Sequence, residues 1–245
     1  MPNLFYSNLI DLKRMMAEFD EHEVKHMLVL RMKPGDFLRF TDGDGKIFSG
    51  VLTEIDRKKL TSKAKIQGIE SYRRRQERSL GLCIPHSRWS RMKFAIEKSV
   101  ELGADLLITC RMDRSNFEVG ERKIKLFVRN VIKQCETPFF PKVLNFNNLA
   151  ELLDWCDENA TTLVHLSKDG VSPRKLLDSV NGGNVVLLAG PEGGFSFNEL
   201  QKLLERSRGM NLGFRTLRFE TALLTALIIL SYEMNLLWGF EKIEG

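Results

Sequence analysis

The stretch that decides the fold is LLAGPEGGFSFNEL, residues 187–200. An apolar run stops at Gly190, and a proline, a glutamate and two glycines follow it. Ser196 precedes Glu199 by three residues, the spacing of a capping box, and apolar residues then recur at helical spacing. The pattern predicts a strand, a tight glycine turn and a capped helix. Such turns often bring backbone close to a ligand, although a plain sharp turn has the same pattern.

The turn lacks the residues of the common phosphate-binding loops. A P-loop needs G-x-x-x-x-G-K-[ST], but Phe195 and Ser196 follow the glycines here. The dinucleotide fingerprint G-x-G-x-x-G does not match GPEGG either. Glu192 also places a carboxylate where a phosphate would lie, so the turn favours a neutral or cationic small molecule.

Strand-like and helix-like segments alternate around this turn. Strands are predicted at residues 80–85, 104–110, 161–166, 184–190 and 214–219, and helices at 88–103, 121–135, 149–159, 196–208 and from Thr221 onward. This alternation is typical of a parallel sheet with helices on both faces, in which ligands bind at the carboxyl ends of strands. GPEGG and LGFRTLRFETA, residues 212–222, both lie at such ends.

Residues 1–71 are predicted to form a separate β-rich domain. Residues 36–55 contain two strand-like runs around Asp42-Gly43-Asp44-Gly45, which is a strong hairpin signal, and residues 59–69 alternate at period two. Several short strands in a small unit indicate a compact barrel. The basic segment YRRRQER, residues 72–78, then links this barrel to an α/β domain of residues 79–245.

The composition is that of a soluble globular protein, with 43% hydrophobic and 28% charged residues. The net charge of +5 favours an anionic partner. No two of the four cysteines form a C-x-x-C motif, and the first residues do not have the pattern of a secretion signal. We therefore expect a cytoplasmic protein whose thiols are reduced. Polar residues interrupt the apolar last helix, which favours a core or subunit-interface helix over a membrane span.

The segment HEVKH, residues 22–26, matches the zinc-protease motif H-E-x-x-H. The predicted helix that carries it is short, and the only other histidines are His86 and His165, so no third ligand follows. We therefore expect no metal site.

Two charged segments each have a structural and a functional interpretation. YRRRQER is either a strip that contacts phosphates or a solvated linker, and both can hold at once. In LRFETA, Thr221 or Glu220 could cap the last helix while Arg218 forms a salt bridge with Glu220. Alternatively, Arg218 is a fixed positive charge beside a ligand pocket.

Together these segments resemble the RsmE-type ribosomal RNA uridine-N3 methyltransferases. LLAGPEGGFSFNE and LGFRTLRFETA are similar to the two C-terminal signature loops of that family. HMLVLRMKPGD and DGDGKIFSGVL are similar to its PUA-like N-terminal barrel, and EKSVELGAD and RMDRS to its central segments. The resemblance covers nearly the whole chain in order. It implies a SPOUT-type α/β trefoil knot for the C-terminal domain, which local patterns cannot predict because folding rules nearly forbid knots.

The resemblance also implies S-adenosylmethionine as the cofactor, bound by the backbone of three loops, and a homodimer with its active site at the subunit interface. The cofactor-binding residues that it implies are Leu166, Gly190, Pro191, Glu192, Gly193, Gly194, Leu212, Gly213, Leu217 and Thr221. Contacts to RNA are expected from His26, Arg31, Arg73, Arg74, Arg75 and Arg114. One departure lies in ETPFFPKV, residues 136–143, where Thr137 stands near a position at which the family commonly carries an arginine.

The implied activity is methylation of uridine N3 in small-subunit (16S) ribosomal RNA. The N3–H group is a weakly acidic imide that must lose its proton before it attacks the methyl carbon, and the base must be unstacked. Arg218 is expected to stabilise the resulting anion and Glu220 to take the proton. A non-catalytic RNA-binding or ribosome-assembly factor that keeps the fold remains the alternative, and it would bind RNA without the cofactor. A zinc peptidase would require stoichiometric metal.

Overall fold

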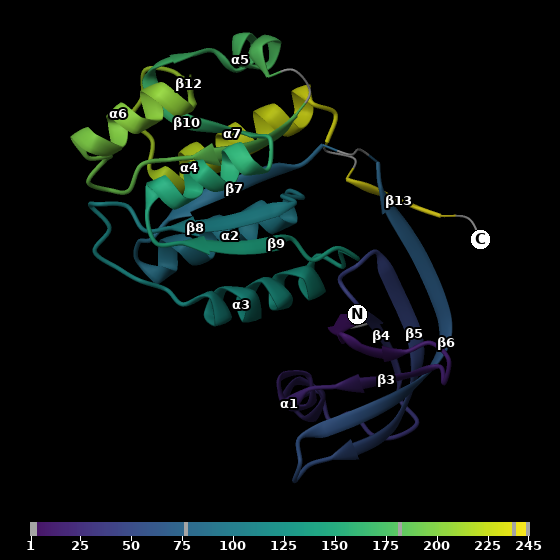
Figure 1. Cartoon of the computed structure of the whole chain (residues 1–245). Helices are drawn as coiled ribbons and strands as arrows, with labels where there is room; N and C mark the ends of the chain where they lie inside the picture. The colour runs from purple at the N-terminus through teal and green to yellow at the C-terminus, as the bar shows by residue number, and fades with distance from the viewer. Residues whose placement is uncertain (1–3, 76–77, 181–182, 237–238, 244–245) are drawn as a thin grey trace. The chain divides into compact units, whose positions relative to one another are not determined.

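The computed structural model of this chain describes residues 4–75, 78–180, 183–236 and 239–243 (Figure 1). Its contacts divide the chain into two units. The first comprises residues 1–74, 129–140 and 240–245, and the second comprises 75–128 and 141–239. Residues 129–140 and 240–245, which the sequence-based division assigned to the α/β domain, thus group with the N-terminal residues. Residues 76–77 of the predicted linker lie outside the described residues.

The first unit is built on a mixed sheet with the strand order β1-β4-β5-β6-β3-β2. Its strands are β1 (Leu4–Tyr6), β2 (Leu9–Asp11), β3 (Met16–Phe19), β4 (Phe37–Thr41), β5 (Lys46–Asp56), β6 (Thr61–Arg74) and β13 (Phe240–Lys242), which pairs with β6. The antiparallel β4–β5 pair confirms the predicted hairpin. Gly43 and Gly45 in its turn have φ of +78° and +86°, conformations that favour glycine. Strand β6 also runs through the first three residues of YRRRQER.

Helix α1 (Glu21–Val29) packs on this sheet. The side chain of Asp20 caps it by accepting a hydrogen bond from the Glu23 amide at 3.2 Å. The buried helix residues Val24 and Met27 join a core of aromatic and aliphatic side chains, which includes Phe5, Phe19, Phe40, Phe48 and Leu52. The apolar alternation of the strands therefore produces one closed core for the first unit.

A buried ion cluster ties the second half of α3 (Glu121–Gln134) to α1 within this unit. Glu23 is fully buried, and its Oε1 lies 2.9 Å from both Lys133 Nζ and Arg129 Nε, the latter contact lacking hydrogen-bond geometry. Arg129 also donates to both carboxylate oxygens of Asp20, at 2.7 and 2.9 Å. Burial opposes the charge on Asp20, but these bonds and the guanidinium charge hold its pKa below the ordinary value.

The same cluster accounts for the segment HEVKH. Glu23 is engaged by two cations, and His22 Nε2 lies 3.0 Å from Asn130 Oδ1. Within the ranges that the structure describes, no group of three or more histidine, cysteine, aspartate or glutamate side chains is arranged to hold a metal ion.

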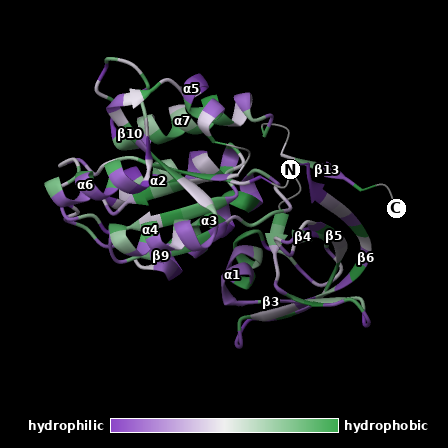
Figure 2. Ribbon diagram, turned by 45° about the horizontal axis from the view of Figure 1, so that its top comes forward, coloured by the Kyte–Doolittle hydropathy of each residue, from purple (hydrophilic) through white to green (hydrophobic). Residues whose placement is uncertain are grey.

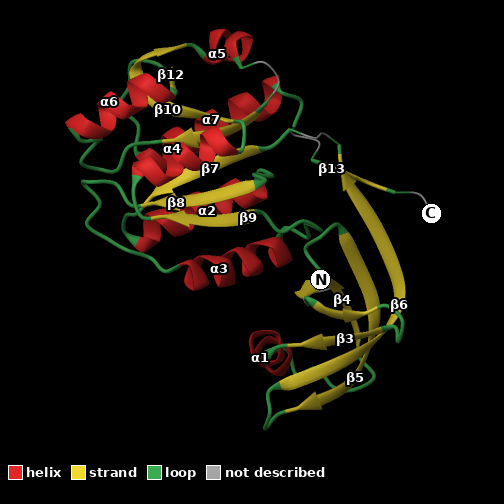
Figure 3. Cartoon of the chain, viewed as in Figure 1, coloured by secondary structure: helices red, strands yellow, loops and turns green. Residues whose placement is uncertain are grey.

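The second unit contains a six-stranded sheet with the order β12-β10-β11-β7-β8-β9, in which all neighbouring strands are parallel (Figure 3). The strands are β7 (Leu80–Pro85), β8 (Leu106–Cys110), β9 (Lys142–Phe146), β10 (Thr161–Val171), β11 (Asn184–Leu188) and β12 (Arg208–Met210). Strands β7, β8, β10 and β11 confirm four of the five predicted strands. The strand predicted at 214–219 is wrong, because those residues form a loop and the first turn of a helix. Strands β9 and β12 were not predicted.

Helices cover both faces of this sheet (Figure 3). Helices α2 (Trp89–Glu101) and α5 (Pro173–Ser179) both contact α7 (Phe219–Glu233), and α7 packs on β7 and β11. On the other face, α4 (Leu149–Glu158) contacts β9, β10 and α6 (Phe197–Arg206). Hydrophobic residues line the helix–sheet contacts (Figure 2), including a cluster of Cys83, Ile108, Leu152, Val186 and Leu203.

The predicted fold class is confirmed as α/β with a parallel sheet and a separate β-rich unit. The threading of the chain into a knot stays a prediction. Among the described helices, none combines the length and apolar character needed to cross a membrane.

Candidate functional site

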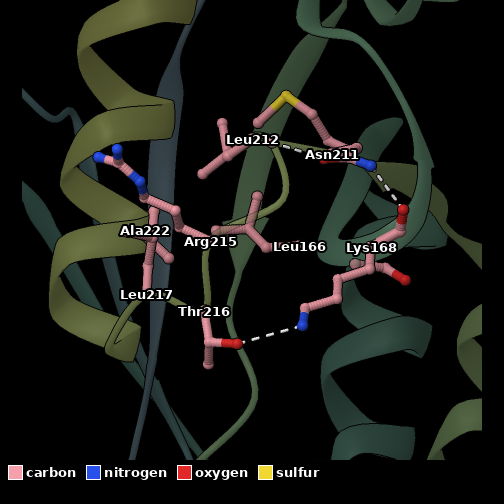
Figure 4. Close-up of a pocket in the computed structure, with 11 residues that line it drawn as sticks. Leu166, Lys168, Asn211, Leu212, Arg215, Thr216, Leu217 and Ala222 are labelled. Carbon is pink, nitrogen blue, oxygen red and sulfur yellow. Dashed lines mark hydrogen bonds between the residues drawn. The ribbon is translucent and has the colours of Figure 1, made fainter.

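A pocket of about 150 Å³ opens where β10 leaves the β11 ladder and β12 ends (Figure 4). One wall comes from residues 166–168 of β10, and the other from the loop after β12 and the start of α7. Its lining consists of Leu166, Ser167, Lys168, Met210, Asn211, Leu212, Gly213, Arg215, Thr216, Leu217 and Ala222. The pocket thus lies just past the residues of β10 that pair with β11 and at the end of β12.

Four of the predicted cofactor-binding residues line this pocket, namely Leu166, Leu212, Gly213 and Leu217. The turn residues 190–194 and Thr221 are not part of its lining. Seven lining residues were not predicted, and four of them have polar or charged side chains that can bind at the rim or in the loop: Lys168, Asn211, Arg215 and Thr216. Three of these four lie in or beside LGFRTLRFETA, so the signature loop itself was the signal that could have identified them.

Asn211 organises the loop that follows β12. Its amide donates to Val171 O at 2.8 Å, its side-chain nitrogen donates to Lys168 O at 2.5 Å, and its Oδ1 accepts from the Gly213 amide at 2.6 Å. Gly213 has φ of +111°, a conformation that an L side chain rarely adopts. These bonds hold the two walls of the pocket together.

The backbone of residues 212–217 is otherwise unused. In the described parts of the chain, none of these residues makes a backbone–backbone hydrogen bond, and only the Gly213 amide is engaged, by Asn211. Backbone polar groups need partners when water is excluded. This loop therefore presents donors and acceptors that a bound molecule can use, next to the apolar side chains of Leu166, Leu212 and Leu217 (Figure 4).

Two cationic side chains lie at the same pocket. Lys168 Nζ donates to Thr216 Oγ1 at 3.1 Å, which bridges the two walls (Figure 4). Arg215 is exposed and has no ion-pair partner among the described residues. The pocket therefore combines an apolar interior with positive charge at its edge.

The GPEGG turn follows β11 and leads into α6, which confirms the predicted strand, turn and capped helix. Ser196 Oγ accepts from the Glu199 amide, and Glu199 Oε2 accepts from the Ser196 amide, completing the capping box. Gly194 has φ of +70° and donates to Pro191 O at 2.8 Å. Gly194, rather than Gly193, is therefore the turn position whose backbone conformation requires glycine.

Side chains from the segments that follow β7 and β8 contact this turn. Arg114 Nη1 donates to Gly193 O at 2.7 Å, and a Cβ on Gly193 would lie 3.2 Å from Arg114 Cβ. Glu192 accepts from Ser87 Oγ at 3.2 Å and pairs with Arg91. Arg114, predicted to contact RNA, thus contacts the glycine turn directly.

We expect Arg114→Ala to loosen the turn without unfolding the protein, because the variant loses the charged donor to Gly193 O. Hydrogen–deuterium exchange should show faster exchange at residues 192–195 and unchanged exchange in β11. Arg111→Ala, which removes a nearby exposed arginine, is the matched control. Equal exchange in the wild type and Arg114→Ala would contradict the bracing role.

The structure changes the geometry expected for LRFETA. Helix α7 begins at Phe219, two residues before the predicted start, and Arg218 is its N-cap without a side-chain capping bond. Arg218 is exposed, whereas Glu220 is only 7% exposed and its Oε2 has no partner in the described chain. Residues two apart on a helix do not face each other. Arg218 and Glu220 therefore do not lie on one side of a strand end, and the salt bridge considered for them is not formed within the described structure.

The predicted RNA-binding residues occupy varied positions. Arg73 pairs with Glu241 at 2.7 Å, and Arg74 lies over the Phe139 ring at 4.5 Å, where burial lowers its pKa. Arg31 is exposed with φ of +58°, and Arg75 follows the end of β6. His26 Nδ1 is buried without a hydrogen-bond partner, and burial, followed by the charge of Lys133, lowers the pKa of this histidine.

Comparison with known proteins agrees with this architecture. An RNA methyltransferase domain matches residues 74–231, and an RNA methyltransferase PUA domain matches residues 19–65. The ribosomal RNA small subunit methyltransferase E of Buchnera aphidicola is 29% identical over 96% of this chain and 97% of its own length.

Two solved structures extend the comparison. A predicted RNA methyltransferase from Thermotoga maritima has a TM-score of 0.76 and 32% identity, over 96% of this chain and 99% of that chain. A ribosomal RNA small subunit methyltransferase E from Neisseria gonorrhoeae, crystallised bound to S-adenosyl methionine, has a TM-score of 0.78 and 25% identity, over 95% and 98%. With a methyltransferase domain across more than half of its length and a PUA domain before it, the chain belongs to the RsmE-type family of ribosomal RNA small subunit methyltransferases.

Proposed function

We propose that this protein transfers a methyl group from S-adenosylmethionine to N3 of a uridine in small-subunit (16S) ribosomal RNA. The pocket between the middle of β10 and the loop after β12 carries the proposal, because it pairs apolar walls with the largely unused backbone of residues 212–217. The Neisseria relative that was crystallised with S-adenosyl methionine supports the same assignment.

The residues present fit this cofactor. Leu166, Leu212 and Leu217 would hold the adenine ring, and backbone amides and carbonyls of the 212–217 loop would read its polar edge. The braced GPEGG turn, in which Gly194 takes a left-handed conformation, would supply the third contact together with Thr221. When bound, the cofactor supplies a methyl group on a positively charged sulfur.

The remaining chemistry belongs to the chain. The uracil N3 proton must leave before N3 attacks, so the anion needs positive charge close by. Arg218 is exposed at the N-terminus of α7. The partial positive charge of the helix dipole at this end lies beside the charge of the guanidinium. Glu220 lies in the first turn of the same helix, and its Oε2 is an unpartnered acceptor suited to receive the proton.

The wider assignments follow from the same proposal. RNA would contact the first unit through His26, Arg31, Arg73 and Arg74, and would reach Arg75 beyond β6. A second copy would cover the exposed apolar residues of α7, Ile228 at 46% and Tyr232 at 70% exposure, to form a homodimer. Such an enzyme acts on ribosomal RNA in the cytoplasm, with no membrane partner.

Methyl transfer from tritium-labelled S-adenosylmethionine tests the proposal directly. We expect small subunits that lack the modification to be labelled, and nucleoside analysis to place the label on N3-methyluridine. Fully modified subunits are the control and should take up little label. Label on another base would contradict the substrate assignment, and RNA binding without cofactor binding would favour the non-catalytic assembly factor.

A further inference from the structure

Phe214 is the only large hydrophobic side chain among the described residues that is 100% exposed. No ring or cation contacts it within the described structure. A single exposed apolar side chain needs no special explanation. The position of this ring, however, is specific, because its two chain neighbours Gly213 and Arg215 line the pocket.

The loop holds Phe214 outward without using its side chain. On one side, Asn211 Oδ1 fixes the Gly213 amide, and Gly213 takes the left-handed φ of +111°. On the other side, Thr216 is held by Lys168 at 3.1 Å. The ring is therefore presented to solvent on a braced turn, which suits a preformed contact surface.

The charges around Phe214 select the partner. From Gly209 to Phe219 the chain carries Arg215 and Arg218 and no acidic residue, and Lys168 lies across the pocket. Aromatic rings next to cations bind single-stranded nucleic acid, because bases stack on the ring while phosphates meet the charges. The same loop of a second copy would bring like charges together, which opposes self-association at this point.

We propose that Phe214 is a positioning residue on which an unstacked RNA base stacks beside the pocket, with Arg215 at the adjoining phosphate. The inference rests on the proposed function, since it assumes that RNA approaches this pocket. The stacked base is the target uridine or its immediate neighbour, and the ring keeps it out of the helical stack while N3 is methylated.

Three substitutions test the inference. Phe214→Leu keeps an apolar side chain but removes the aromatic face, Phe214→Ala removes both, and Phe214→Trp restores the face. We expect the leucine and alanine variants to raise the KM for unmodified small subunits between about fivefold and about a hundredfold, the range for one stacked base. The tryptophan variant should stay within a factor of about three of the wild type. Phe197→Leu, which changes a ring 72% exposed on α6, is the matched control and should leave KM unchanged.

Two further measurements separate the possible outcomes. Oligouridylate should quench the fluorescence that Phe214→Trp adds, which a purely structural role would not produce. Cofactor affinity by calorimetry and dimer mass by sedimentation should be equal in all variants. Wild-type KM in Phe214→Leu would overturn the inference, as would loss of the dimer, which would make Phe214 a subunit contact. Failure of the wild type to methylate RNA would instead overturn the proposed function.

Discussion

Arg218→Ala should fold and bind S-adenosylmethionine like the wild type, yet transfer methyl groups to RNA at least about a hundredfold more slowly. The reason is that removal of one group that stabilises a developing negative charge typically costs this much in turnover. We expect little change in stability, because the exposed Arg218 side chain neither caps α7 nor pairs with Glu220.

The controls for this prediction lie in the same segment. Arg218→Lys should recover only part of the rate, since a point charge cannot reproduce the planar guanidinium. Arg208→Ala removes an exposed arginine from β12, outside the pocket lining, and should leave turnover unchanged. Single-turnover rates and melting curves would be measured on the same samples. A rate that falls only with the folded fraction would remove Arg218 from the chemistry.

Glu220 requires a separate measurement, since the structure does not place it on the same face as Arg218. If Glu220 takes the imide proton, Glu220→Gln should be slow at neutral pH and partly rescued at high pH, where the imide ionises without a base. A rate deficit independent of pH would leave Glu220 with a structural role at the start of α7.

Glu23→Ala should destabilise the first unit by about 3–5 kcal/mol, the cost of removing one partner from a buried ion pair. The variant would leave the Arg129 and Lys133 side chains, only 9% and 7% exposed, without their buried carboxylate. The Tyr6 amide, which donates weakly to Glu23 Oε2 at 3.4 Å, would also lose its acceptor. Asp20 would remain bonded to Arg129, so part of the cluster would persist.

The same helix supplies the control for this second prediction. Glu21 pairs with Lys25, but both side chains are 62% exposed, so Glu21→Ala should cost well under about 1 kcal/mol. Urea unfolding of both variants, followed by a probe in the first unit, gives the two free energies. Equal values for Glu21→Ala and Glu23→Ala would show that the buried cluster contributes no more than a surface pair.

Patterns of a few residues were enough for much of the architecture. The β4–β5 hairpin follows from Asp42-Gly43-Asp44-Gly45, and the helix after GPEGG follows from Ser196 and its capping box. Both are local, since the bonds that define them join residues only a few positions apart. The buried strands β7, β8 and β11 follow from short, mostly apolar runs, although their ladder bonds join distant residues.

The short strands at the two edges of the parallel sheet, β9 and β12, could not be predicted from such local patterns. Strand β12 has three residues, and its pairing with β10 depends on a partner more than forty positions earlier. The segment 214–219 has a strand-like composition. Its last residue, Phe219, nevertheless begins α7 and packs into the core. Tertiary burial therefore overrode local propensity.

For the candidate site, the signature loop LGFRTLRFETA contributes most of one wall of the pocket, whereas the GPEGG turn is not in its lining. Only the tertiary structure brings the Arg114 side chain to the Gly193 carbonyl and the Asn211 side chain to the Lys168 carbonyl. It also places Arg218 and Glu220 on different faces of the first turn of α7. It likewise buried Glu23 against cations more than a hundred positions away. The contacts of Arg114, Asn211 and Glu23 join residues whose separation along the chain carries no periodic signal, so they are set by packing and charge in the folded protein.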